Sequence, residues 1–174
     1  MVRSGKTRNE LMEECSEVYA RFPKFCDEYY KLFLEESVTR EEFIPRDWQV
    51  ELNDELSGTP DNRKVIWYCD INGNRGKSFF ARNFKGNAYI INGGKAADIY
   101  YAYFYEPVVF FDLARQKEDI VAYDVMENFK NGYFLSTKYQ VRRVIFNIPH
   151  VVVFANFMPD QSKLSADRWD IRVI

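Results

Sequence analysis

The sequence contains one histidine and three cysteines among its 174 residues. A lone histidine, His150, excludes most histidine-based metal chemistry. The cysteines are odd in number and unclustered, so the sequence predicts neither a disulfide framework nor a cysteine zinc site. No apolar run approaches the ~18 residues that span a bilayer, and the N-terminus has no secretory hydrophobic region. We therefore expect no membrane partner.

The net charge of the chain is also small. The formal charge of −2 excludes a surface coated with basic residues, although a local basic patch would suffice to bind nucleic acid. Hydrophobic residues make up 47% of the chain and aromatic residues 17%. This is enough for one compact domain with its own core, or for one domain with a small appended subdomain.

The first third of the chain is typical of amphipathic helices. Apolar side chains recur at three- and four-residue spacings over residues 10–22, with Asn9 as the expected N-cap. The members of this stripe are Leu11, Cys15, Val18 and Phe22. A second helix is predicted over residues 25–34. Two such short helices must pack on each other, on the rest of the chain or on a neighbouring subunit.

Residues 39–64 contain scattered prolines and a glycine, which predict a linker and irregular structure with an extended segment at residues 51–52. From residue 64 onward, short apolar runs alternate with helical patterns. The runs that predict strands are 65–69, 89–91, 108–111 and 151–154, with one arm of a hairpin at 144–146. The segments that predict helices are 78–84, 96–104 and 120–130. This alternation is typical of an α/β domain with a mainly parallel sheet.

A glycine-rich segment, residues 70–78, lies between the first of these strands and the helix that follows. Glycines at 73 and 76 let backbone N–H groups turn toward phosphate oxygens, and the N-terminus of the next helix favours the same anion. Lys77 would reach the β- and γ-phosphates of ATP, and the Ser78 hydroxyl would coordinate Mg²⁺. The pattern therefore predicts a phosphate-binding loop.

The match to the usual loop is incomplete. Ile71 stands where the pattern G-x-x-x-x-G-K-[ST] has its first glycine, Asp70 occupies the loop entry, and the loop is one residue longer. The alternative is a polar turn between strand and helix whose lysine is solvated.

Two other apolar strands end in side chains that suit the same chemistry. Asp112 follows the strand at 108–111 and would hold the Mg²⁺, while Asn156 follows the strand at 151–154 and could orient the attacking water. The carboxyl ends of parallel strands meet at one edge of the sheet, where α/β proteins bind ligands. Taken singly, Asp112 could be a solvated strand end, and Asn156 could begin a turn.

Several segments together resemble the superfamily 3 helicase part, an AAA+ ATPase, of the Rep replication initiators of circular single-stranded DNA viruses. The Walker A segment is matched by Trp67-Tyr68, Asp70 and Gly73-Asn74-Arg75-Gly76-Lys77-Ser78-Phe79, and the Walker B strand by Asp112 with Arg115. The segment between them is matched by Gly93-Gly94-Lys95 with Asp98, and the B′ region by Lys130-Asn131-Gly132 with Lys138-Tyr139. The most specific match is to motif C and the stretch after it, over residues 150–156, 159–160 and 163–169.

The resemblance implies a role for each matching residue. Residues 73–79 would bind the nucleotide, that is Gly73, Asn74, Arg75, Gly76, Lys77, Ser78 and Phe79. Lys77 and Asp112 would serve hydrolysis, with Ser78 and Asp112 on the metal and Asn156 as sensor 1. Arg168 would be an arginine finger toward the neighbouring subunit's ATP, or else a structural ion pair beside Asp167 and Asp170. Lys138 and Tyr139 would lie on a hairpin that grips single-stranded DNA.

The resemblance also implies an assembly and a location. Residues 1–46 would be a helical oligomerisation subdomain and residues 47–174 the AAA+ domain, and the homo-oligomer would be a hexameric ring. The protein would act in the host nucleus. Rep proteins carry an N-terminal endonuclease domain with a metal-binding histidine pair, and a chain with one histidine is expected to lack it.

The expected function is thus an ATP-dependent DNA helicase motor. One departure concerns the general base, because Leu113 stands where many relatives have a second acid, and Glu118 and Asp119 are the nearest acids in the chain. The base is unassigned. The alternative function is a non-catalytic, nucleotide-binding module that assembles the Rep ring. A small-molecule kinase would also have a phosphate loop, but it would leave residues 150–169 unexplained.

Overall fold

The computed structural model describes residues 5–113 and 121–174. Contacts divide the chain into two compact units, one up to Glu41 and the other Glu42–Ile174. The division lies between residues 41 and 42, close to the boundary at residue 46 that the sequence predicts.

The N-terminal unit consists of helices α1 (Arg8–Glu14), α2 (Ser16–Arg21) and α3 (Pro23–Glu36). The single helix predicted over residues 10–22 is wrong, because the helix breaks at Cys15. The predicted N-cap is also wrong. Thr7 caps α1 by accepting from the backbone N–H of Glu10, while the Glu10 carboxylate accepts from the backbone N–H of Thr7.

This unit exposes most of its apolar side chains. Leu11 is buried, but Val18 and Phe22 of the predicted stripe are 51% and 59% exposed. Helix α3 buries none of its residues, and its Phe25, Tyr29 and Leu32 are also exposed. We call Val18, Phe22, Phe25, Tyr29 and Leu32 the α2–α3 apolar residues. Exposed apolar side chains in such numbers are typical of an interaction surface.

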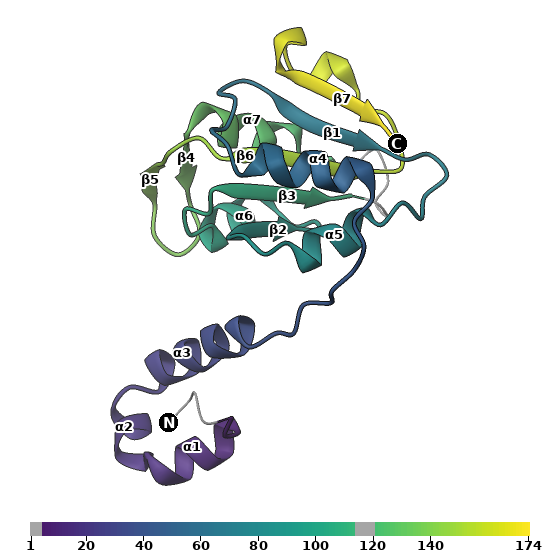
Figure 1. Ribbon diagram of the computed structural model, residues 1–174. Coiled ribbons are helices and arrows are strands. Elements are labelled where there is room, and N and C mark those ends of the chain that lie inside the picture. The colour runs from purple at the N-terminus through teal and green to yellow at the C-terminus, as the bar shows by residue number, and fades with distance from the viewer. Residues whose placement is uncertain (1–4, 114–120) are drawn as a thin grey trace. The chain divides into compact units, whose positions relative to one another are not determined.

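The second unit is built on a parallel sheet, as the sequence predicts, but with five strands where the sequence predicts four. Its strands are β1 (Val65–Cys69), β2 (Ala88–Ile91), β3 (Val108–Asp112), β6 (His150–Ala155) and β7 (Trp169–Val173). They lie in the order β2-β3-β6-β1-β7 and are all parallel, so these five strands end at the same edge of the sheet (Figure 1). Strand β6 therefore separates β1 from β3, and the polar residues that follow these three strands share one edge.

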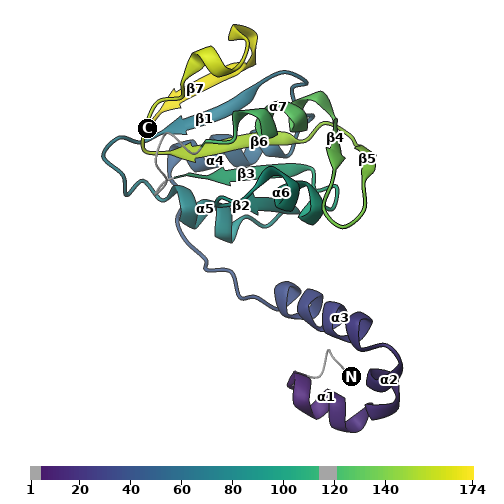
Figure 2. The same ribbon diagram turned by 180° about the vertical axis from the view of Figure 1, so that it is seen from behind.

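Helices cover both faces of the sheet (Figures 1 and 2). One apolar core joins the sheet to α4 (Asp47–Leu56) and α5 (Lys77–Asn83). The other joins it to α6 (Ala96–Ala102) and α7 (Tyr123–Asn131). Successive residues of each strand alternate between the two cores, which is why strands such as β1 and β6 are buried along their whole length.

Helix α4 contradicts the predicted linker and the extended segment at residues 51–52. Trp48, Leu52 and Leu56 recur every four residues and so lie on one side of the helix. Leu52 is fully buried, and the Trp48 ring lies 5.1 Å from that of Tyr68 and 5.7 Å from that of Phe80. Packing against the sheet stabilises α4. The sequence prediction missed this helix because prolines and a glycine lie on either side of it.

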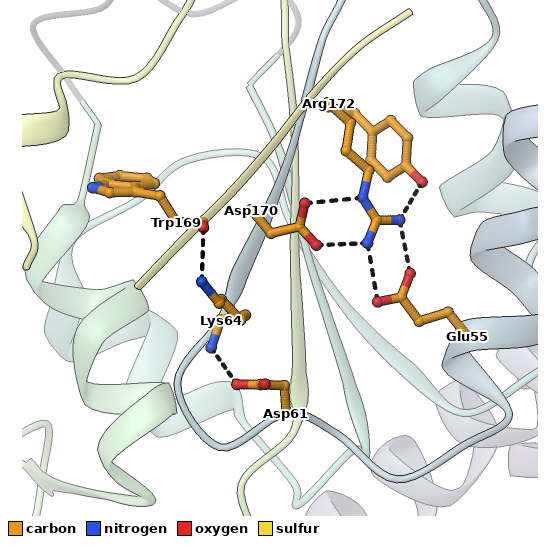
Figure 3. A network of polar contacts seen from close by, with 7 residues as sticks. Glu55, Asp61, Lys64, Trp169, Asp170 and Arg172 are labelled. Carbon is orange, nitrogen blue, oxygen red and sulfur yellow. Dashed lines mark hydrogen bonds and ion pairs between the residues drawn. The ribbon is translucent and has the colours of Figure 1, made fainter. Parts of the chain in front are cut away.

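An ion network fastens α4 to the edge strand β7 (Figure 3). The Arg172 guanidinium donates to both oxygens of Asp170, at 3.1 and 2.6 Å, and to both oxygens of Glu55, at 2.7 and 3.1 Å. It also donates to the Tyr68 hydroxyl at 3.0 Å. Hydrogen bonds to Asp170 first, and then to Glu55 and Tyr68, raise the pKa of Arg172 against the opposing effect of burial. One bidentate ion pair thus joins α4 to β7, and the other holds Arg172 within β7.

The hairpin of β4 (Tyr133–Ser136) and β5 (Arg142–Ile145) contains the arm that the sequence predicts. It lies at the opposite end of the sheet from the loop between β1 and α5 in both views (Figures 1 and 2). The last strand, β7, follows two short 3₁₀ helices, Gln161–Lys163 and Ala166–Arg168.

The structure describes all three cysteines and the single histidine. All three cysteines are free thiols. His150 begins β6, is buried, and lies 3.2 Å from the Gly58 carbonyl oxygen through Nε2. Burial lowers its pKa. Over the described ranges, the helices are too short or too polar to cross a bilayer.

Candidate nucleotide site

The loop between β1 and α5 turns through left-handed backbone conformations. Gly73 and Gly76 have φ of 73° and 81°, which explains why glycine occupies both positions, and Asn74 between them has φ of 68°. A hollow of about 260 Å³ opens above the loop, lined by residues 74–79 and Asn156. The structure thus brings six of the seven predicted nucleotide-binding residues and the predicted sensor to one place. The seventh, Gly73, does not line the hollow, but a Cβ on it would lie 3.7 Å from Asn156 Nδ2.

Lys77 is the centre of this arrangement. Its ammonium donates to Asp70 Oδ2 at 2.9 Å and to Asn156 Oδ1 at 2.8 Å. Lys77 is only 4% exposed, so the alternative of a solvated lysine in a polar turn is wrong. The first residue of α5 therefore binds the residues that follow β1 and β6.

Asp70, at the entry to the loop, binds the loop backbone and Lys77. Its carboxylate, 1% exposed, accepts from the backbone N–H groups of Gly73 at 2.8 Å and Arg75 at 3.1 Å. Burial alone would raise the pKa of Asp70, but the hydrogen bond from Lys77 and those from the backbone outweigh it, so the pKa is lowered. The Asp70 carboxylate thus accepts hydrogen bonds from two loop N–H groups and from Lys77, and these bonds fix the conformation of the loop.

Gln49 of α4 supports the loop from outside, and sequence reasoning missed it. The side chain is 3% exposed; Nε2 donates to the Gly76 carbonyl oxygen at 3.4 Å, and Oε1 accepts from the backbone N–H of Arg46 at 2.9 Å. A Cβ on Gly76 would lie 3.3 Å from Gln49 Nε2. The four-residue spacing of Trp48, Leu52 and Leu56 could have revealed the helix, although not this contact.

Replacing Gln49 with leucine should therefore loosen the loop. For an ATP-hydrolysing site, we expect kcat/KM to fall about 10- to 100-fold, the range in which small misplacements reduce turnover, because the Gly76 carbonyl loses its side-chain donor and keeps the backbone N–H of Phe80. The control is Asn53→Leu, which also replaces a side-chain amide of α4 with leucine but at an exposed position. Steady-state kinetics of both variants check this positioning role, and equal values would contradict it.

Asp112 and Ser78 lie at the same edge of the sheet. Asp112 ends β3 and is half-buried, in register with Phe154 of β6, two residues before Asn156. It does not line the hollow. The Ser78 side chain belongs to the first turn of α5 and is exposed. A serine hydroxyl and a carboxylate are oxygen donors of the kind that Mg²⁺ takes, one or two at a time, alongside substrate phosphates.

Arg168 lies away from the hollow. It is 4% exposed, its Nη2 donates to Asn131 Oδ1 at 2.6 Å and lies 3.9 Å from Glu127 Oε1. Its Nε and Nη1 have no hydrogen-bond partner among the described residues. The structural reading of this arginine is favoured, with partners on α7 instead of Asp167 or Asp170. Asp167 pairs with Arg63 and Asp170 with Arg172.

The segment that resembles the B′ region divides between core and surface. Lys130 is buried and donates to the carbonyl oxygens of Asp61 and Pro149, at 2.9 Å each. Burial lowers the pKa of Lys130 to about 8. Lys138 and Tyr139 lie in the turn between β4 and β5, where Tyr139 is 84% exposed. Arg115, Glu118 and Asp119 lie outside the described residues.

Comparison with known proteins finds relatives among viral replication proteins, although no family model matches. The chain is 36% identical over 181 residues to the Para-Rep C2 protein of Milk vetch dwarf C2 alphasatellite, a match that covers 96% of this chain and 63% of that protein. It is 33% identical over 171 residues to the Master replication protein of Subterranean clover stunt virus (strain F), covering 97% and 59%. The chain is Rep-like.

A third relative of the Rep-like chain is the Master replication protein of Banana bunchy top virus, 38% identical over 123 residues, which are 70% of this chain and 43% of that protein. The Rep-like chain spans less than two thirds of the length of each of these relatives. The Master replication proteins are named for replication.

Proposed function

We propose that this Rep-like chain is an ATP-hydrolysing DNA helicase motor that takes part in replication of a circular single-stranded DNA genome. The observation that carries the proposal is the buried Lys77 ammonium, 2.8 Å from Asn156 and 2.9 Å from Asp70. A lysine held at the end of β1, beside the first turn of α5 and the residue after β6, is placed where α/β sheets bind phosphates. The order of the strands, with β6 between β1 and β3, supports placing the unit among the AAA+ ATPases.

Each side chain of the site would have a separate task. The free N–H groups of the first turn of α5 would bind phosphate oxygens, and Lys77 would neutralise charge on the β- and γ-phosphates. The Asn156 amide, next to Lys77, would orient the attacking water. Ser78 and Asp112 would hold Mg²⁺, which supplies charge neutralisation at the phosphates. The base stays unassigned.

We further propose that the chain works as a hexameric homo-oligomer. The α2–α3 apolar residues support an oligomerisation role for the N-terminal unit, because exposed apolar groups of this kind are stabilised by burial between copies. Single-stranded DNA would bind Lys138 and Tyr139 on the hairpin. By the family resemblance alone, the full protein would also have an endonuclease domain and act in the host nucleus.

One observation favours a second function, a nucleotide-binding module that assembles the ring without hydrolysis. Asp70 places a carboxylate on the lysine that would bind phosphate, and it also takes up two loop N–H groups. An anion already in contact with Lys77 weakens the attraction of the loop for a second anion.

Turnover separates the two functions. Purified protein is assayed for phosphate release from ATP and Mg²⁺, with and without single-stranded DNA, while its mass is followed by light scattering. If the chain is a motor, it should be an oligomer that hydrolyses ATP, and single-stranded DNA should raise the rate of hydrolysis. Nucleotide binding and ring formation without turnover would favour the module. A monomer under all conditions would contradict a hexameric motor.

A further inference from the structure

The turn of the hairpin lies against helix α6, and the two elements together form a second hollow. Its volume is about 340 Å³, and it is lined by Tyr101 of α6 with Lys138, Gln140 and Arg142 of the hairpin. Tyr101 is 49% exposed. We call this the α6–hairpin notch. The hairpin that contributes to it lies at the end of the sheet opposite the loop between β1 and α5 (Figures 1 and 2).

The notch contains the two kinds of group that bind a single strand, namely rings for bases and cations for phosphates. The rings of Tyr101 and Tyr139 lie 5.2 Å apart at an interplanar angle of 70°. The Lys138 ammonium lies 5.5 Å from the centroid of the first ring and 5.3 Å from that of the second. Arg142 adds a second exposed cation. Stacking on tyrosine is tolerant of sequence, since every base has an aromatic face.

One acid opposes this use of the notch. Asp98 of α6 pairs with Lys138, Oδ1 to Nζ, at 2.6 Å. The hydrogen bond with Lys138 lowers the pKa of Asp98 and raises that of Lys138, so both groups are charged at neutral pH. A DNA phosphate competes with the Asp98 carboxylate for the ammonium, and it is repelled by that carboxylate as it approaches.

We propose that the α6–hairpin notch binds one nucleotide of single-stranded DNA, with Tyr101 and Arg142 as contacts beyond Lys138 and Tyr139, and that Asp98 is a built-in competitor of the phosphate. This inference rests on the proposed function, because it extends the DNA contact of the same hairpin. Asp98 keeps the affinity of the notch for a DNA phosphate low, so that the hairpin releases one phosphate easily before it binds the next.

The salt dependence of DNA binding tests the competition directly. When Lys138 meets a phosphate in the native protein, Asp98 is freed and attracts a cation, which cancels the counterion that the DNA releases. In Asp98→Asn the release is no longer cancelled. We expect binding of a fluorescent oligothymidylate to tighten about 3- to 10-fold at low salt, and the slope of log K against log[salt] to steepen by about 0.7, the value for one single-strand phosphate.

The matched control is Asp54→Asn, which removes one negative charge from the exposed side of α4. It should leave the slope unchanged. The double variant Asp98→Asn/Lys138→Ala should lose the gain, because Lys138 is the group that Asp98 neutralises. Tyr101→Ala should weaken binding about tenfold, whereas Tyr101→Phe, which keeps the ring, should not.

The failure of this inference can be distinguished from failure of the proposed function. If Lys138→Ala and Tyr139→Ala weaken binding but Asp98→Asn and Tyr101→Ala do not change it, the competitor and the extended contact are wrong and the hairpin remains the DNA site. If none of the hairpin variants changes binding, both the notch and the proposed DNA contact are wrong.

Discussion

Replacing Lys77 with alanine should abolish ATP hydrolysis and also destabilise the protein. Loss of one preorganised charge from a phosphoryl-transfer site is expected to lower kcat by at least about 10²–10³. The structure adds the second effect, because the side chains of Lys77 and Asp70 are 3% and 1% exposed. Removing one partner of a buried pair costs about 3–5 kcal/mol. Phosphate release and thermal unfolding of the same preparation measure the two effects.

Two further variants keep loss of function distinct from loss of fold. Ser78 is exposed and outside the buried pair, so Ser78→Ala should lose Mg²⁺-dependent turnover at an unchanged melting temperature. Lys85, exposed beyond the end of α5, gives a lysine-to-alanine control that should change neither. If Lys77→Ala hydrolyses ATP at the native rate, the phosphate-loop interpretation is wrong.

Replacing Asp70 with asparagine should have the second large effect, and its direction depends on nucleotide. Without ATP the Lys77 ammonium is buried with no counter-charge, and we expect the free energy of unfolding to fall by about 3 kcal/mol. The same change removes the anion that competes with phosphate. Saturating ATP should therefore raise the melting temperature of Asp70→Asn more than that of the native protein. An equal or smaller ATP-induced rise would show that Asp70 does not compete.

The pH dependence of this difference has a definite sign. The pKa of Asp70 is lower in the folded protein than its ordinary 3.8, so its stabilising contribution is fully present above that value and is lost as pH falls through the folded pKa. The gap in urea stability between native protein and Asp70→Asn should thus be constant from pH 7 to about 4 and shrink below it. A gap that closes between pH 7 and 5 would point to another group.

The core strands could be predicted from sequence because they are buried on both faces, which makes them continuous apolar runs. That pattern located β1, β3 and β6 to within a residue or two, and the polar residues that follow them identified the site edge. Strand β7 was missed. It alternates apolar and charged residues, Trp169-Asp170-Ile171-Arg172-Val173, as an edge strand does, and two of those charges serve the network of Figure 3.

The parts that could not be predicted depend on contacts between distant residues. Helix α4 is defined by packing on Tyr68 and Phe80 more than by its own pattern, and Gln49 contacts a loop that follows 27 residues later. Likewise, the pairing of Lys138 with Asp98 joins segments 40 residues apart. Such partners follow from the assembled sheet, which a reading of local spacing does not supply.

The position of β1 in the sheet has a consequence for how the chain folds. Both neighbours of β1, residues 150–155 and 169–173, are about 80 or more residues later in the chain. The loop between β1 and α5 therefore emerges from the ribosome long before the strands that pair with β1. Strand pairings this distant in sequence form slowly, because the entropy of closing the long loop is lost before the stabilising contacts form. Under the proposed function, ATP would find a shaped pocket only once synthesis has passed residue 173, so nucleotide binding would report completion of the sheet.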